Sequence, residues 1–445
     1  MSMGASAGAS TALLTDMYEY TMLDAALQDG TAERHCVFEV FTRRLPQGRR
    51  YGVVAGTGRL MEAVRDFRPS ASDIQFLADR HIVSEPTLHW LENYRFSGRI
   101  RGYREGETFF PNSPILQVEG SFAECTLLET LILSILNYDS AVASAASRMV
   151  SAANGRPCMD MGARRANEWA AVSAARAAIV GGFQGTSNLQ AAKLYDLPAI
   201  GTAAHCFTLL HDSERDAFVS QIQAFGKNTT LLTDTYSIED AVKTAVEVAG
   251  PDLGGVRIDS GDLASLAQRV RNQLDELGAH QASITVTNDL DEYAIASLQT
   301  APVDSYGVGT QLVTGSGAPT CSMVYKLVER EGADGSMVPV AKRSKNKATV
   351  PGRKEAFRSY EYNLASAEHV ISGSAQALAA FQAPEDWRDL LVSYMENGEA
   401  NPEFLGADGL MRARDHRAKS LAELPIAAMS LLSGEPVIPT QEQLL

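Results

Sequence analysis

The sequence has little of what marks secreted, membrane-spanning or disulfide-stabilised proteins. Its five cysteines among 445 residues are odd in number, widely spaced and without a C-x-x-C pair, so they indicate buried thiols in a reducing compartment. The stretch MSMGASAGAS has neither a basic nor an apolar region, so residues 1–11 are expected to be a flexible tail and not a signal peptide. The most apolar run, CTLLETLILSILNY, is interrupted by Glu129 and is too short to cross a bilayer. We therefore expect a cytoplasmic protein.

Positive charge is also scarce. The chain has 39 Lys and Arg against 54 Asp and Glu, which gives a formal net charge of −15. This balance argues against general binding to nucleic acid or to anionic membranes, because both need a basic surface. A small anionic substrate is still compatible, since it needs only a local basic patch.

One basic segment is present, VAKRSKNKATVPGRKEAFR. Its cations fall within seventeen positions: Lys342, Arg343, Lys345, Lys347, Arg353, Lys354 and Arg358. The segment is either a solvated surface loop or a flap over a polyphosphate, because a highly charged anion needs cations close to it.

The hydrophobic pattern changes twice along the chain. Residues 12–125 mix strand patterns such as HCVFEVFTRRLP with turns and predict an α+β domain. Within 126–330, short apolar runs end in polar loops that precede helical patterns, and seven such units predict parallel strands with crossover helices. That number favours an irregular, TIM-like α/β barrel. Residues 331–445 are expected to return and pack on the N-terminal domain.

Two helices of the barrel region have clear boundaries. SIEDAVKTAVEVAG offers Ser237 as N-cap and Gly250 as the end. DLASLAQRVRNQLDELG places Leu263, Leu266, Val270, Leu274 and Leu277 on one face. Because the loops that follow parallel strands share one edge, we expect MDMGARR, GGFQGTSN, IGTAAH, LLTDTY, RIDSGD, VTNDLD and YGVGTQ to converge.

RIDSGD is the sharpest local motif. Asp259 and Asp262 at a strand end suit Mg²⁺, which prefers hard oxygen ligands and keeps waters or substrate oxygens. The same carboxylates could hold ribose hydroxyls or stabilise positive charge at a sugar carbon. The alternative is that they only cap the following helix.

The segment YGVGTQLVTGSG is rich in glycine. Gly307 and Gly309, with Thr310, allow backbone N–H groups to approach a phosphate. The segment is not a P-loop, because it has no G-K-[ST], and an ordinary turn remains the alternative.

His205, in GTAAHCF, has three possible roles: a core imidazole, a metal ligand or a nucleophile. Metal ligation is disfavoured, because His211 lies six positions away and there is no His/Cys cluster. A core imidazole is the commonest fate of a histidine. The position after a predicted strand nevertheless places His205 on the same edge as Asp259, where a neutral imidazole could attack a phosphoryl group.

Seven segments, taken in order, resemble the nicotinate phosphoribosyltransferase family of type II phosphoribosyltransferases: LLTDMYEYTM, FEVFTRRLPQGRRYGVVAG, GFQGTSN, GTAAHCF, RIDSGDL, YGVGTQL and KRSKNKATVPG. The resemblance runs from about residue 12 to 360. It implies transfer of a phosphoribosyl group from 5-phosphoribosyl-1-pyrophosphate to nicotinate in NAD salvage, with Mg²⁺ and with ATP hydrolysis coupled through a phosphohistidine. It also implies a homodimer with shared active sites.

The resemblance also implies roles for individual residues. His205 matches the phosphorylated histidine, Asp259 and Asp262 the residues near the ribose and Mg²⁺, and Tyr18 an aromatic that stacks on the pyridine from the neighbouring subunit. The remaining matches are Arg164, Thr186 and Ser187 near the base and Arg257 near the base and phosphate. Gly307, Gly309 and Thr310 match the 5′-phosphate loop, Asn288 and Asp289 the adjoining loop, and Lys342, Lys345 and Lys347 a flap over ATP or another polyphosphate.

The residue type at Ser187 favours one of two related substrates, nicotinate over nicotinamide. The similar nicotinamide enzymes have an acidic residue at this position, which accepts from the amide. A carboxylate there would repel nicotinate, whereas a hydroxyl can donate to it. The competing hypotheses are a nicotinamide or quinolinate phosphoribosyltransferase, a Mg²⁺-dependent barrel lyase or aldolase, and a catalytically inactive scaffold.

Overall fold

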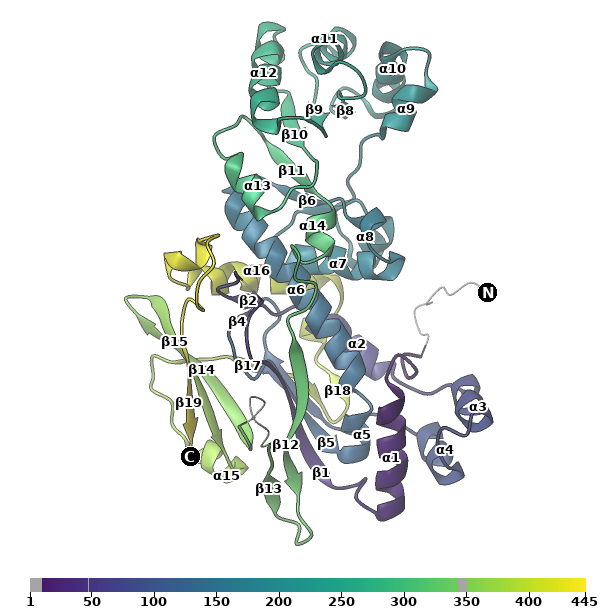
Figure 1. The fold of residues 1–445 in the computed structure, drawn as a ribbon, viewed down its shortest axis with the longest axis vertical. Helices are drawn as coiled ribbons and strands as arrows, with labels where there is room; N and C mark the ends of the chain where they lie inside the picture. The colour runs from purple at the N-terminus through teal and green to yellow at the C-terminus, as the bar shows by residue number, and fades with distance from the viewer. Residues whose placement is uncertain (1–9, 47, 343–349) are drawn as a thin grey trace. The chain divides into compact units, whose positions relative to one another are not determined.

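The computed structural model describes residues 10–46, 48–342 and 350–445. The chain forms two compact units: unit 1 contains the described parts of 1–141 and 320–445, and unit 2 is the continuous segment Val142–Pro319. Unit 1 is thus assembled from both ends of the chain, and Figure 1 shows the purple β1 and the green β12 in one sheet.

The larger sheet of unit 1 has seven strands in the order β13-β12-β1-β5-β3-β17-β18, with antiparallel pairing throughout. Their bounds are β1 (His35–Thr42), β3 (Arg99–Tyr103), β5 (Leu116–Ser121), β12 (Met323–Glu331), β13 (Met337–Pro339), β17 (Leu391–Glu396) and β18 (Glu399–Ala400). Strand β1 lies inside the sheet and is buried at every position after the first, so both of its faces are covered.

A second sheet of unit 1 has the order β16-β14-β15-β19, and a short pair is formed by β2 and β4. The bounds are β2 (Gly52–Val53), β4 (Thr108–Phe109), β14 (Arg353–Glu361), β15 (Leu364–Gly373), β16 (Arg388–Asp389) and β19 (Thr440–Leu444). Strand β19 pairs with β15 in parallel, so the C-terminal strand lies beside the β14–β15 hairpin (Figure 1).

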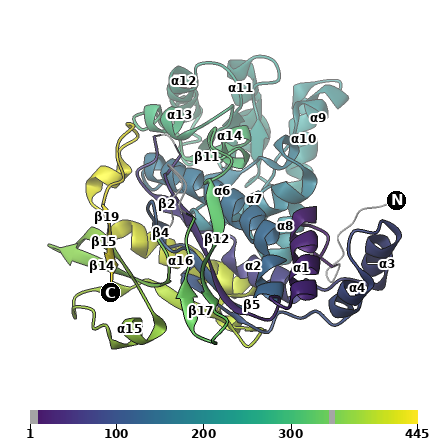
Figure 2. The same cartoon turned by 60° about the horizontal axis from the view of Figure 1, so that its bottom comes forward.

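Unit 1 also contains helices, of which α3 and α4 lie side by side (Figure 2). The bounds are α1 (Met17–Asp29), α2 (Thr57–Arg65), α3 (Ala71–Asp79), α4 (Glu85–Glu92), α5 (Phe122–Thr126), α15 (Ala375–Ala380), α16 (Gly406–Ala422) and the 3-10 turns η2 (Pro402–Phe404) and η3 (Ile426–Met429). The long helix α6 (Glu129–Ala153) begins in unit 1 and continues into unit 2.

A buried ion-pair network joins the N-terminal and C-terminal parts of unit 1. The fully buried guanidinium of Arg358 donates to Glu107 over 2.6 Å and to Glu368 over 3.1 Å. Burial alone would raise the pKa of Glu107, but Arg358, His416 and Arg388 hold it well below its usual range. This network therefore keeps a carboxylate charged inside the protein.

The basic segment is not a flap along its whole length. Arg353, Lys354 and Arg358 belong to strand β14, and Lys354 donates to Glu39 over 2.8 Å with both side chains almost fully buried. These cations satisfy buried carboxylates of unit 1, which corrects their assignment to a basic surface. Lys342 is exposed, and Lys345 and Lys347 lie outside the described residues.

Unit 2 is built on a six-stranded parallel sheet in the order β7-β6-β11-β10-β9-β8. The bounds are β6 (Cys158–Asp160), β7 (Gly185–Thr186), β8 (Thr230–Leu232), β9 (Gly255–Ile258), β10 (Ser283–Val286) and β11 (Ser305–Val308). Its helices are α7 (Glu168–Val180), α8 (Leu189–Tyr195), α9 (His205–Leu210), α10 (Glu214–Phe225), α11 (Ile238–Ala249), α12 (Leu263–Glu276), α13 (Glu292–Ser297), α14 (Thr310–Val313) and the turn η1 (Ala163–Arg165).

The mixed α/β class is confirmed, but a closed barrel is not. Within the described residues the pairings run from β7 to β8 without a bond between these two edge strands, so the sheet is open. The predicted boundaries of α11 are confirmed: the side chain of Ser237 accepts from the N–H of Asp240, and Gly250 ends the helix with φ of 81°. In α12 Val270 and Leu274 are buried as expected, whereas Leu277 lies at the C-cap and is 36% exposed.

Four of the five thiols are buried as expected, and Cys206 on α9 is exposed. In the part of the chain that the structure describes, no helix combines the length and the apolarity needed to cross a membrane.

We expect Arg358→Met to lower the free energy of unfolding by about 3–5 kcal/mol, because it leaves Glu107 and Glu368 as buried carboxylates without this partner. Chemical denaturation at neutral pH measures the change. As the control, Arg99→Ala removes an ion pair to Glu396 that is about half exposed and should cost about 1 kcal/mol or less. An equal decrease in the free energy of unfolding in the two variants would contradict the role of the network in holding the two parts of unit 1 together.

Candidate functional site

The carboxyl ends of the six parallel strands meet at one edge of the unit 2 sheet, and the loops that follow the strands begin there. Ser187 follows β7, Asp259 follows β9 and Gly309 follows β11. Ligands of parallel α/β sheets collect at this edge, because neighbouring loops bring their side chains and backbone N–H groups together. The convergence of the loops is therefore a consequence of the strand direction.

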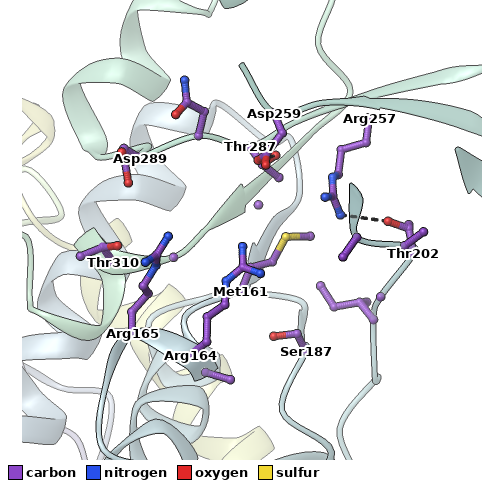
Figure 3. A pocket seen from close by; sticks show the side chains of 18 residues that line it. Met161, Arg164, Arg165, Ser187, Thr202, Arg257, Asp259, Thr287, Asp289 and Thr310 are labelled. Atoms are coloured by element: carbon purple, nitrogen blue, oxygen red, sulfur yellow. Dashed lines mark hydrogen bonds between the residues drawn. The ribbon is translucent and has the colours of Figure 1, made fainter. Parts of the chain in front are cut away.

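A cavity of about 410 Å³ opens among these loops. It is lined by Met161, Ala163, Arg164, Arg165, Ser187, Ile200, Gly201, Thr202, Ala203, Ala204, Arg257, Asp259, Thr287, Asn288, Asp289, Gly307, Gly309 and Thr310. Figure 3 shows Ser187 and Arg257 toward one end of the cavity and Thr310 and Asp289 toward the other. The volume is that of a small-molecule site.

Arginines supply the positive charge of the cavity. Arg164 and Arg165 come from the turn η1 after β6, and Arg257 comes from β9 (Figure 3). Burial lowers the pKa of Arg257 from its ordinary value, although Asp259 and Asp234 oppose that shift. Arg257 donates to the hydroxyl of Thr202 over 2.9 Å, and its buried Nε has no hydrogen-bond partner within the described residues. An acidic protein thus keeps a local site for an anion.

The turn that carries Arg164 is held by a buried carboxylate. Asp160 accepts from the N–H of Gly162 over 2.8 Å and from the hydroxyl of Thr186 over 2.6 Å. Burial raises the pKa of Asp160, and the bond from Thr186 opposes that effect. Gly162 leaves no room for a side chain, because a Cβ there would lie 2.3 Å from Val313. Asp160 and Gly162 therefore fix where the two loops from β6 and β7 begin.

Asp259 is held in the cavity wall by its neighbours. The hydroxyl of Thr287 donates to its carboxylate, and its own backbone N–H donates to Asp234 over 3.1 Å. The side chain of Asp262 instead caps α12: it accepts from the hydroxyl of Ser265 over 2.6 Å and is absent from the cavity lining. The bonds to Ser265 lower the pKa of Asp262.

His205 opens α9, immediately after the lining residues Thr202–Ala204. Its Nε2 lies 3.1 Å from Oδ1 of Asp234, and the other carboxylate oxygen accepts from the hydroxyl of Ser260 over 2.8 Å. The His205 side chain is 41% exposed, whereas that of Asp234 is 2% exposed. Asp234 thus connects an accessible imidazole to the loop that carries Asp259.

Close contacts leave no room for a side chain at Gly307, inside β11. A Cβ on Gly307 would lie 2.5 Å from the sulfur of Met161 and 2.6 Å from Thr287. On the neighbouring loop, Asn288 and Asp289 both have positive φ, at 95° and 44°. Non-glycine residues in this conformation are strained, and such strain gathers at functional loops.

The structure gathers most of the residues expected from the sequence. Nine of them line the cavity: Arg164, Ser187, Arg257, Asp259, Asn288, Asp289, Gly307, Gly309 and Thr310. Thr186 lies behind the cavity and is fully buried on Asp160. Tyr18 lies in unit 1 on α1, is 44% exposed, and has a pKa raised to about 12 by partial burial and by Glu129. Lys342 also lies in unit 1.

Among side chains with polar or sulfur atoms, sequence reasoning missed five residues of the site: Asp234, Arg165, Met161, Thr202 and Thr287. Asp234 stands in LLTDTY, two residues after the end of β8, so the rule that placed the other loops at this edge would have identified it. Arg165 is next to Arg164 in the same motif. Met161, Thr202 and Thr287 have side chains that are common elsewhere in the chain, so only the coordinates identify them.

The arrangement combines three chemical abilities. Arg164 and Arg257 can hold an anion, Asp259 can stabilise positive charge in a substrate, and the pair of His205 and Asp234 can act as an oriented nucleophile. Among the described residues, no group of three or more His, Cys, Asp or Glu side chains could hold a metal ion by itself. Any Mg²⁺ at this site must take most of its ligands from the substrate or from water.

Two family models match the chain. Residues 13–137 match the nicotinate phosphoribosyltransferase N-terminal domain, and residues 157–360 match the nicotinate phosphoribosyltransferase family. The second range contains every residue that lines the cavity.

Curated relatives agree with these models over almost the whole chain. A Mycobacterium tuberculosis nicotinate phosphoribosyltransferase, pncB1, is 52% identical over 437 residues, which cover 96% of this chain and 94% of the relative. A Bacillus subtilis nicotinate phosphoribosyltransferase is 38% identical over 360 residues, covering 78% of this chain and 73% of the relative.

Solved structures share the fold. The crystal structure of human nicotinic acid phosphoribosyltransferase matches with a TM-score of 0.80 at 26% identity, covering 97% of both chains. A nicotinate-nucleotide pyrophosphorylase from Pyrococcus furiosus matches with a TM-score of 0.75 at 24% identity, which shows the fold alone, covering 96% of this chain and 99% of that one. Because the family models match more than half of the chain and the 52% identical relative covers 96% of it, the chain belongs to the nicotinate phosphoribosyltransferase family.

Proposed function

We propose that the protein transfers the phosphoribosyl group of 5-phosphoribosyl-1-pyrophosphate to nicotinate and so forms nicotinate mononucleotide and pyrophosphate. The observation that carries the proposal is the order of groups along the cavity. Arg257 and Ser187 lie toward one end and Thr310 toward the other, with Asp259 in the wall (Figure 3). A small carboxylic acid at the first end and a sugar phosphate at the second would meet near Asp259.

At the base end, Arg164 and Arg257 attract the carboxylate of nicotinate, and the hydroxyl of Ser187 donates to it. The partial burial of Arg257 strengthens this attraction, because charges interact more strongly where water is excluded. At the other end, the backbone N–H groups around Gly309 and Thr310 bind the 5′-phosphate, beside the loop of Asn288 and Asp289.

The reaction needs no general base, because the pyridine nitrogen already has a free electron pair. That nitrogen attacks C1 of the ribose, the bond from C1 to the pyrophosphate oxygen breaks, and the electron pair leaves with pyrophosphate. Positive charge develops on the sugar as that bond breaks. The carboxylate of Asp259, oriented by Thr287 and by its backbone bond to Asp234, stabilises that charge.

The site fits a Mg²⁺ ion that is bound by the substrate as well as by the protein. Asp259 is the strand-end carboxylate in the cavity wall, Asp289 is a second lining carboxylate, and Mg²⁺ is commonly held by one or two carboxylates together with substrate phosphates. When bound, the ion neutralises the charge of the leaving pyrophosphate. Asp262 is the weaker candidate ligand, because its carboxylate caps α12.

His205 serves the coupling to ATP. The bond between Nε2 and Asp234 keeps the proton on that nitrogen and leaves the electron pair on Nδ1. Nδ1 attacks the γ-phosphorus, the bond to the β-phosphate oxygen breaks, and ADP leaves with the electron pair. Asp234 stabilises the positive imidazole ring. Water later cleaves the N–P bond, which resets the enzyme.

A homodimer completes the proposal. Tyr18 is more than one third exposed, and Leu14 and Met17 beside it are 64% and 62% exposed. Such an exposed apolar patch is typical of a protein interface, and it would allow Tyr18 to stack on the pyridine ring in a partner's cavity. We expect Lys342 to bind a phosphate of ATP. Lys345 and Lys347, which we assign to the same flap, lie outside the described residues.

A substrate panel tests the function. Release of pyrophosphate is measured with nicotinate, nicotinamide and quinolinate, and we expect turnover with nicotinate alone. Ser187→Asp should raise the KM for nicotinate by at least about tenfold, because two like charges then face each other, whereas Ser187→Ala should raise it by only a few-fold. Equal activity with nicotinamide would overturn the assigned specificity.

Asp259→Asn should lower kcat by about 10²–10³ with little change in either KM, because the stabilising charge acts mainly in the transition state. Steady-state kinetics with saturating Mg²⁺ measures the effect. Asp262→Asn is the matched comparison and should retain the rate to within a few-fold. A loss in that variant as large as in Asp259→Asn would instead place Asp262 in the metal site.

His205→Ala should retain slow formation of nicotinate mononucleotide and lose its stimulation by ATP. In the wild type, label from γ-phosphate ATP should appear on the protein in an acid-labile, base-stable form, and the variant should not be labelled. His211→Ala is the control from the same region, since the His211 ring bonds a backbone carbonyl of α9. Full ATP stimulation in His205→Ala would remove His205 from the coupling.

A further inference from the structure

An ion pair in unit 2 lies outside the cavity and is not used by the mechanism. Arg148 on α6 donates from Nε to Oε1 of Glu292 over 3.0 Å, and the two side chains are 4% and 2% exposed. The guanidinium also lies over the ring of Tyr293, with its central carbon 6.0 Å from the ring centre. Such a pair costs desolvation energy, so its geometry needs a reason other than stability.

The second oxygen of Glu292 accepts from the hydroxyl of Ser316. Ser316 has φ of 54° between Gly315 and Gly317, which also have positive φ. A serine in this conformation is strained where glycine is not. The hydrogen bond from its hydroxyl to Glu292 offsets part of that strain. The turn follows α14 directly, and the N–H of Ser316 donates to the carbonyl of Gln311 over 2.6 Å.

Glu292 is also the first residue of α13. The preceding Asp291 caps the helix by accepting from the N–H groups of Tyr293 and Ala294. The strained cavity residues Asn288 and Asp289 lie only a few positions earlier. Fixing Glu292 on α6 therefore fixes the end of the loop that carries these two residues.

We propose that Glu292, anchored by Arg148, is a positioning residue that sets the Asn288–Asp289 loop and the Gly309–Thr310 turn at the spacing that the phosphoribosyl donor requires. Glu292 is connected to both segments. It follows the Asn288–Asp289 loop closely in the chain, and its carboxylate accepts from Ser316, which follows the Gly309–Thr310 turn and α14. Neither Glu292 nor Ser316 lines the cavity, so both act through other groups. This inference rests on the proposed function, because that function assigns the two loops to the donor.

The decisive variant is Ser316→Ala, which removes one hydroxyl and leaves the buried ion pair intact. We expect the KM for 5-phosphoribosyl-1-pyrophosphate to rise about tenfold, while kcat and the KM for nicotinate stay within about twofold. Glu292→Gln should produce the same split. In both variants, amide hydrogen exchange with the donor bound should become faster at residues 287–291 and 309–317.

Arg156→Leu is the matched control. Arg156 donates to the carbonyls of Leu298 and Gln299, just past the other end of α13, and to the hydroxyl of Tyr306. We expect it to lower the melting temperature without changing the KM for the donor. A general loss of packing would raise that KM in Arg156→Leu as well, which would overturn a specific role for Glu292.

An unchanged KM for the donor in Ser316→Ala and Glu292→Gln, with wild-type kinetics otherwise intact, would also overturn the inference. A wild-type protein that does not turn over the donor at all would contradict the proposed function instead. The two failures are therefore distinguishable.

Discussion

The parallel direction of six strands is the constraint on which the cavity depends. Because β6 to β11 all point the same way, segments as distant as Arg164 and Thr310 end at one edge of one sheet. No side chain has to reach across the unit to meet another. Hydrogen bonds between strands thus determine which residues meet, and the loops determine only how they meet.

Buried acids behind the loops provide the finer placement. Asp160 holds the turn of Arg164, Asp234 connects His205 to the loop of Asp259, and Glu292 accepts from Ser316. These carboxylates accept bonds from backbone or hydroxyl groups and do not line the cavity. An acidic chain can therefore contain a cavity whose lining has three arginines, Arg164, Arg165 and Arg257, against two aspartates, Asp259 and Asp289.

The fold and the site were predictable from the sequence to different extents. Ser237 and Gly250 gave the limits of α11 correctly, because caps act locally. The closed barrel was not confirmed, because the number of strand-like units does not determine whether edge strands pair. Arg353, Lys354 and Arg358 looked like an exposed basic run, since their buried partners Glu39, Glu107 and Glu119 come from distant positions of the chain. Their nearer partners, Glu329 and Glu368, lie on the neighbouring elements β12 and β15. The loop of Asp234, LLTDTY, was expected at this edge, but Asp234 itself was not singled out because one aspartate after a short strand forms no motif.

The division of the chain into units has a consequence for biosynthesis. Unit 2 is one uninterrupted segment, so all six of its strands leave the ribosome before the second part of unit 1 does. Strand β1 can pair with β12 only after nearly three hundred further residues have been translated. Glu107 likewise lacks Arg358 until 251 further residues have been translated. The later-synthesised segment thus completes a domain that was started first. During that interval β1 and β3, which can already pair with β5, each keep one unpaired edge, and Glu107 lacks Arg358.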